Sequence, residues 1–145
     1  YFNYKNELGI KLTDRTPIAY LKDSNSLIGI NGNVFKNEQT RNDSLPSING
    51  NISQQQILKI LNVISAFKKD KFFKNKLKEI WFKNGHLYVR IKNLDFDVNL
   101  GNQNRINDKL KMLKAFYAYK SKKINHKNYK QIDLVYNNRL VAIKK

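Results

Sequence analysis

The beginning of the chain alternates apolar and polar residues in the way that is typical of β-strands. Leu8, Ile10 and Leu12 alternate with small or polar residues, which predicts a half-buried strand. Residues 17–21 continue the extended chain, because the residue before a proline avoids the helical region. Pro17 has no backbone N–H to donate, so it favours an edge strand or the start of a strand.

A hairpin and a polar loop are predicted next. Residues 27–30 and 34–35 are apolar segments on either side of Asn31-Gly32-Asn33, whose residues tolerate the positive φ angles of a tight turn. Residues 36–51 are polar and contain Pro46 and Gly50, so we expect a loop there.

The first helix is predicted near residues 53–68, where the signals of a helix N-terminus are complete. Ser53 and Gln56 have the spacing of a capping box, and Ile52 and Ile57 have that of a hydrophobic staple. An apolar stripe at helical spacing follows, made of Ile57, Ile60, Leu61, Ile64 and Phe67.

A second amphipathic helix is predicted near residues 104–119. Its apolar face contains Ile106, Leu110, Leu113 and Tyr117, with Phe116 beside it. We expect three of its lysines to point largely toward water: Lys109, Lys111 and Lys114.

Three alternating segments between the helices predict a β-meander. They cover residues 77–82, 87–91 and 96–100, and the turns between them fall at Asn84-Gly85 and Lys92-Asn93. The predicted fold class is therefore α+β, with an antiparallel, mostly meander sheet and two main helices packed on one face.

The end of the chain predicts a last pair of strands. Ile132, Leu134 and Tyr136 alternate with other residues, Asn137-Asn138 supplies a two-residue turn, and residues 139–144 return as a strand. A terminal strand usually has one neighbour, so we expect it at the edge of the sheet, where a partner can add a strand.

The composition indicates one soluble globular domain that folds without disulfides. The chain has 145 residues, 41% of them hydrophobic, and no cysteine. No apolar run approaches the roughly 18 residues that span a bilayer. Because the sequence begins with Tyr1 rather than Met, we expect it to be a fragment whose signal or anchor segment lies upstream.

The charge is strongly basic and unevenly distributed. The chain has 28 Lys+Arg, 11 Asp+Glu and a formal net charge of +17, and most of the excess lies after residue 67. Only five of the basic residues are Arg and Asn is abundant, which a codon bias toward Lys and Asn would also produce. The alternative function that we keep open is binding of an anionic polymer, either nucleic acid or a cell-envelope polyanion, by the Lys-rich half.

Residues for catalysis or metal binding are not grouped in the sequence. His86 and His126 lie forty positions apart and have no ligand at metal-binding spacing, so we interpret them as surface side chains. Asp95 and Asp97 share the spacing of one strand face, but they alternate with apolar residues as an exposed face does. The Gly32 turn is followed by a strand, which excludes a phosphate loop. We expect no enzyme activity, metal or cofactor.

Aromatic residues are interleaved with the lysines, as they would be in a stacking platform for nucleic acid: Phe72, Phe73, Trp81, Phe82 and Tyr88. Trp81 and Phe82 are adjacent in a strand, so one of them must face inward. Phe72-Phe73 precedes the meander, where it would close the edge of the core. We therefore do not expect nucleic acid as the partner.

Five short segments in order resemble the bacterial cell-division family FtsQ, also called DivIB. They are IKLTDRTPIAYL (10–21), LIGINGNVF (27–35), LPSINGN (45–51), FDVNLG (96–101) and QIDLVYNNRLVAIK (131–144). Asn31 stands where the family commonly has Asp. Val135 replaces the usual Arg of the closing segment, so no polar contact of that Arg is carried over.

The resemblance implies a non-enzymatic division protein with one membrane-spanning helix upstream of this chain. Residues 1–22 would end a POTRA-like region, and residues 23–145 would form the β domain. The family resides in the cell inner membrane, with this domain on the extracytoplasmic (periplasmic) side at the division septum, and it recruits FtsB and FtsL by strand addition at its C-terminal edge.

The predicted partner-binding surface at that edge consists of Tyr136, Asn137, Asn138, Arg139, Leu140, Val141, Ala142 and Ile143.

Overall fold

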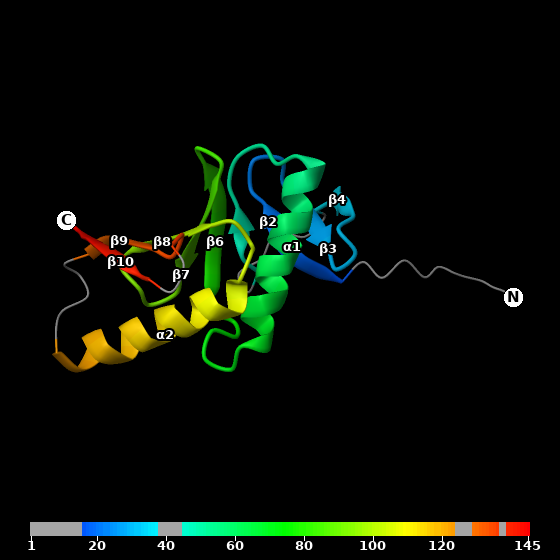
Figure 1. The fold of residues 1–145 in the computed structure, drawn as a ribbon. Helices are drawn as coiled ribbons and strands as arrows, with labels where there is room; N and C mark the ends of the chain where they lie inside the picture. The colour runs from blue at the N-terminus through cyan, green and yellow to red at the C-terminus, as the bar shows by residue number, and fades with distance from the viewer. Residues whose placement is uncertain (1–15, 38–44, 124–128, 137–138) are drawn as a thin grey trace, which may run out of the picture.

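The computed structural model describes residues 16–37, 45–123, 129–136 and 139–145, with the backbone alone for 119–123. The predicted strand at Leu8–Leu12 therefore lies outside the described residues. The described part contains two helices and one mixed sheet whose strands lie in the order β10-β9-β8-β7-β6-β5-β2-β3-β4 (Figure 1). The strands are β2 (Pro17–Leu21), β3 (Ser26–Gly29), β4 (Val34–Lys36), β5 (Ser47–Ile48), β6 (Leu77–Lys83), β7 (His86–Ile91), β8 (Asp97–Gly101), β9 (Tyr129–Asp133) and β10 (Val141–Lys144).

Helix α1 (Gln54–Lys69) agrees with the prediction at both ends. Ser53 is the N-cap: its Oγ accepts a hydrogen bond from the Gln56 amide at 3.2 Å, and its own amide donates to Gln56 Oε1 at 2.9 Å. This reciprocal pair satisfies two amides that the first turn leaves without helical partners. The buried face contains Ile57, Ile60, Val63, Ile64, Ala66 and Phe67.

Helix α2 (Ile106–Lys123) is longer than predicted, and one lysine that we expected to point toward water is buried. Lys111 is exposed as expected, but Lys109 is only 2% exposed. The Lys109 side chain reaches back over the loop before the helix, where its Nζ donates to the carbonyls of Leu100 at 2.6 Å and Asn102 at 2.9 Å. Those acceptors lie four or more positions upstream of the helix, so a helical pattern alone does not reveal them.

The antiparallel prediction is confirmed for the meander and the hairpin but wrong for the whole sheet. β6, β7 and β8 pair antiparallel, as do β3 and β4. However, β5 pairs in parallel with both β2 and β6, and β8 pairs in parallel with β9. β5 lies in the segment predicted as a loop, and its two residues are too few to show strand periodicity.

Both helices are crossovers between parallel strands, and this explains their shared face. α1 connects β5 to β6, and α2 connects β8 to β9. Since β5 and β8 run in the same direction and each crossover advances the same way along the sheet, the right-handed rule places both helices on one side. This agrees with the predicted layer of helices and with their arrangement in Figure 1.

The core lies between this helical layer and a continuous apolar row across five strands. The paired residues Ile48, Ile80, Val89, Val98 and Ile132 follow one another through the sheet, and each is fully buried.

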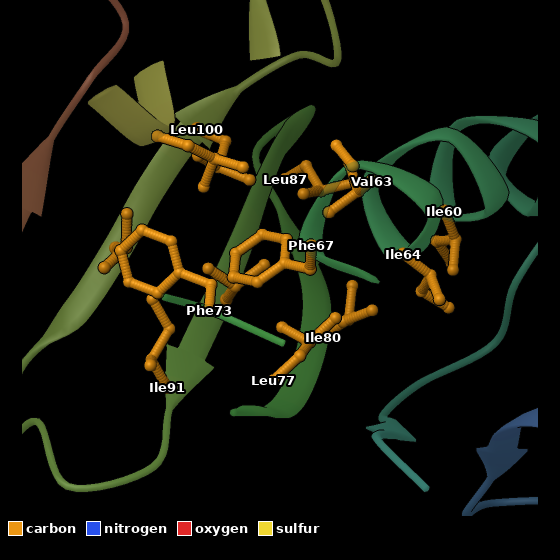
Figure 2. Close-up of a cluster of buried hydrophobic side chains, with 14 of the residues drawn as sticks. Ile60, Val63, Ile64, Phe67, Phe73, Leu77, Ile80, Leu87, Ile91 and Leu100 are labelled. Carbon is orange, nitrogen blue, oxygen red and sulfur yellow. The ribbon is translucent and has the colours of Figure 1, made fainter. Parts of the chain in front are cut away.

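Side chains of α1 lie against the sheet beside Ile80 of this row (Figure 2). Phe67 packs on Phe73 with ring centroids 5.6 Å apart, and Phe73 packs edge-on against Phe72 at 4.9 Å. The Phe72-Phe73 pair therefore closes the edge of the core, as predicted, and does not form a stacking platform.

Candidate functional site

Strand β10 forms one end of the sheet, as predicted for the terminal strand. In the described part of the chain it pairs with β9 alone, through Val141–Asp133, Ala142–Ile132 and Ile143–Gln131. A strand with one neighbour leaves alternate N–H and C=O groups unpaired on its outer side. The backbone of β10 therefore has the geometry that strand addition requires.

The two sides of β10 differ in chemistry. Ala142 pairs with Ile132, so it points toward the helices and packs partly against the core. Val141 and Ile143 point to the opposite, helix-free face, where both are half-buried. An added strand would thus extend the apolar core row on one face and meet Val141 and Ile143 on the other.

The connection between β9 and β10 differs from the predicted two-residue turn. Asn137 and Asn138 lie outside the described residues, but Val141 pairs with Asp133, whereas a turn at 137–138 would pair Val141 with Leu134. The strand begins at Val141 rather than Arg139. Leu134 instead donates its amide to the Asn99 carbonyl at 2.9 Å, which keeps this residue attached to β8.

The connection presents an aromatic and a cationic side chain at the end of the sheet. Tyr136 is 45% exposed and is not a core residue. The guanidinium carbon of Arg139 lies 4.5 Å from the centroid of the Tyr136 ring, which is within the range of a cation–π contact. Leu140 packs partly against the core. The structure thus brings Tyr136, Arg139 and β10 together.

The helix-free face next to this edge carries a polar network that the sequence analysis did not find. Arg90 donates from Nε and Nη2 to Asp97 Oδ1 at 3.0 and 2.7 Å, and its Nη1 lies 3.5 Å from Glu79 Oε2. Glu79 also accepts from Asn49 at 2.9 Å. The hydrogen bonds that Arg90 donates to the Asp97 carboxylate raise the pKa of Arg90. Cross-strand register creates this network, so only the pairing of β6, β7 and β8 reveals it.

This network also corrects the interpretation of the two aspartates. β8 begins at Asp97, and Asp95 lies in the bend before it, so the two carboxylates do not share a strand face. Asp97 is bound to Arg90, and Asp95 is exposed. The arrangement is that of a structural ion pair next to a solvated carboxylate.

The remaining candidates lie on the same face or outside the described chain. Trp81 stacks on Tyr88 with ring centroids 5.7 Å apart and planes 13° apart. His86 is exposed, and its Nδ1 lies 3.2 Å from Asn99 Nδ2. His126 is outside the described residues. Among the side chains that are described, no three His, Asp or Glu residues are grouped for metal binding.

Comparisons with known proteins place the chain in a family. A search of curated proteins gives no match. The solved extracytoplasmic domain of the bacterial cell-division protein DivIB from Geobacillus stearothermophilus superimposes with a TM-score of 0.51. The two sequences are 18% identical, and the match covers 79% of this chain and 100% of that one, so this likeness shows the fold.

No helix in the described residues is both long and apolar enough to cross a membrane. The family model "FtsQ/DivIB, C-terminal related" matches residues 16–143, which is most of the chain, and the chain therefore belongs to the FtsQ/DivIB C-terminal related family.

Proposed function

We propose that this chain is a non-enzymatic scaffold domain of the cell-division machinery that binds FtsB-like and FtsL-like proteins through β10. The observation that carries the proposal is the position of β10 at the end of the sheet, in a chain that belongs to the FtsQ/DivIB-related family. The partner contributes a strand that pairs with the outer side of β10. Main-chain hydrogen bonds supply affinity, and alternate side chains supply specificity.

The contact surface that we propose has a backbone part and a side-chain part. Val141, Ala142 and Ile143 supply the strand, and Val141 and Ile143 also supply apolar contacts on the helix-free face. Tyr136, Asn137, Asn138, Arg139 and Leu140 form the adjoining connection. The exposed Tyr136–Arg139 pair has the residue types that are enriched at the centres of protein interfaces.

We further propose how the domain is placed in the cell. The chain up to Lys22 would end a POTRA-like region, and residues 23–145 would form the β domain. A membrane-spanning helix upstream would anchor the protein in the inner membrane, with this domain on the periplasmic side at the septum. The family assignment supports this placement.

Proline substitution in β10 tests the proposed interface. Proline cannot donate to a strand ladder, so Val141→Pro or Ala142→Pro, whichever amide points outward, removes a hydrogen bond to the added strand. We expect affinity for a peptide from the FtsB-like partner to fall at least about tenfold, which corresponds to about 1.4 kcal/mol. Isothermal titration measures the affinity, and circular dichroism checks the fold.

Val34→Pro is the matched control, because β4 forms the other end of the sheet and Val34 is its first residue. This variant should keep the affinity of the unmodified chain. Undiminished binding by both β10 variants, in folded protein, would place the interface elsewhere.

Salt dependence separates strand addition from the alternative of a bound polyanion. Binding that rests on phosphate or other polyanion contacts weakens linearly with the logarithm of salt concentration. Strand addition depends on main-chain and apolar contacts, so its affinity should change little across the same titration.

A further inference from the structure

A groove runs along α1 and has no part in the proposed function. It lies far from β10 in the strand order. It consists of two adjoining hollows of about 410 and 230 Å³, which share Ile18, Ile64 and Lys68 in their walls. We call these two hollows the α1 groove. A cavity of about 150 Å³ lined by apolar side chains holds benzene, so each hollow is large enough for an apolar side chain.

The walls of the α1 groove come from a helix and from a turn that packs against it. In the turn between β3 and β4, a Cβ at Gly32 would lie 3.2 Å from Leu61 Cδ1, so the turn leaves no gap on that side. Ile30 extends from the same hairpin, lines the groove and is 51% exposed. Leu58 is 59% exposed and lies one helical turn before Leu61. The apolar side chains of Ile30 and Leu61 therefore line part of the groove, and Leu58 is exposed next to Leu61 on the helix.

The end of the α1 groove is strongly cationic. Lys68 and Lys69 are exposed and line it, and residues 68–78 contain six lysines and one acidic residue. That acidic residue, Asp70, is bound to Lys114, with 2.8 Å between Oδ2 and Nζ. The positive field at this end is therefore not neutralised by carboxylates of the same segment.

These features favour one kind of occupant. A second copy of this chain carries the same net charge of +17 and is repelled. A flat bilayer surface does not reach Ile18 and Ile64, which are 4% and 3% exposed in the floor. An amphipathic helix inserts side chains at i, i+3, i+4 and i+7 into such a groove. We propose that the α1 groove binds an acidic amphipathic segment of a partner protein.

A pair of peptides tests this proposal with the full 145-residue chain. Both peptides carry leucines at i, i+3, i+4 and i+7; one has glutamates between them, and the other has lysines at the same positions. We expect the glutamate peptide to bind, with NMR shift changes at Ile30, Leu61 and Ser65, and the lysine peptide not to bind. Failure of the glutamate peptide to bind, or equal binding of both, would overturn the proposal.

Matched variants locate the binding. Lys68→Glu combined with Lys69→Glu should lower the affinity for the glutamate peptide at least about tenfold. Lys83→Glu combined with Lys111→Glu makes the same change of charge at exposed positions outside the groove and should leave the affinity within about twofold. Equal losses of affinity in both double variants would mean that net charge alone determines binding of the peptide. That result would overturn the proposal.

A second matched pair separates the α1 groove from the β10 interface. Ile30→Ser should lower the affinity for the glutamate peptide. Tyr136→Ser removes an exposed apolar side chain at the other end of the sheet and should leave this affinity unchanged. Ala142→Pro should also leave this binding intact, so failure of the proposed β10 interface does not affect the result. Loss of peptide binding in Tyr136→Ser or Ala142→Pro would overturn the proposal. Anionic vesicles that bind at the α1 groove and are not displaced by the glutamate peptide would also overturn it.

Discussion

Lys109 is a buried cation whose hydrogen-bond partners are uncharged. Its Nζ donates to the carbonyls of Leu100 and Asn102, and burial lowers its pKa to about 8, with Arg105 adding to the shift. Folding therefore disfavours the charged form. Between pH 8 and the unfolded value near 10.5, the unfolded chain holds more protons, so the free energy of unfolding rises with pH.

Lys109→Met tests this prediction at the residue scale. In urea denaturation between pH 7 and pH 10, the free energy of unfolding of the unmodified chain should rise relative to Lys109→Met by up to about 3 kcal/mol, because each pKa unit corresponds to about 1.4 kcal/mol. Lys111→Met is the control, since Lys111 is exposed on the same helix. Parallel pH profiles for all three proteins would contradict the prediction.

At the residue scale, the sequence predicts the position of the candidate site at the sheet edge but not the contacts that depend on residues in other strands. Tyr136 and β10 were placed at the sheet edge because a chain terminus and an alternating segment are local signals. The register was not predictable, because the pairing of Val141 with Asp133 rather than Leu134 depends on the Leu134 bond to Asn99 in another strand. Arg90 and its carboxylates were missed for the same reason.

At the scale of the element, α1 was predictable because its signals lie within a few residues of one another. The capping box predicts that Ser53→Ala lowers the free energy of unfolding by about 1 kcal/mol, since it leaves the Gln56 amide without its acceptor. Ser65→Ala is the control, because Ser65 is exposed in the helix interior, where alanine is favourable. Thermal or urea unfolding of both variants checks the difference, and equal effects would argue against the cap.

Elements that depend on distant partners were not predictable. β5 has only Ser47 and Ile48, and what makes it a strand is pairing with β2 on one side and β6 on the other. The parallel pairing of β8 with β9 likewise follows from the crossover through α2, and the antiparallel pairing of β6, β7 and β8 gave no signal of it.

At the scale of the whole molecule, two helical crossovers are joined through an ion pair. Asp70 follows α1, and its carboxylate contacts Lys114 of α2 at 2.8 Å. Burial acts to raise the pKa of Asp70, but hydrogen bonds from Lys114 and from the amides of Phe73 and Phe72 outweigh burial and lower it. The stabilisation is therefore present above the unfolded pKa of 3.8 and is lost as the pH falls below it.

Asp70→Asn should lower the free energy of unfolding by about 1–2 kcal/mol at pH 7, because it weakens hydrogen bonds to a charged acceptor. The difference from the unmodified chain should shrink as the pH falls through the folded pKa, which lies below 3.8. A double-mutant cycle with Lys114→Met separates the ion pair from the two amide bonds. A difference that persists unchanged at low pH would show that the carboxylate charge has no part in the effect.

The two residues of β5 also determine how mechanical load would pass through the domain. Hydrogen bonds from Tyr20 to Pro46 (2.9 Å), from Lys22 to Ile48 (3.0 Å) and from Asn49 to Ile80 (3.0 Å) connect the β2–β4 part of the sheet to the β6–β10 part. Tension applied at residue 16 and resisted at β10 crosses this narrow seam. The seam and the packing of α1 across it therefore set the force at which the two parts of the sheet separate.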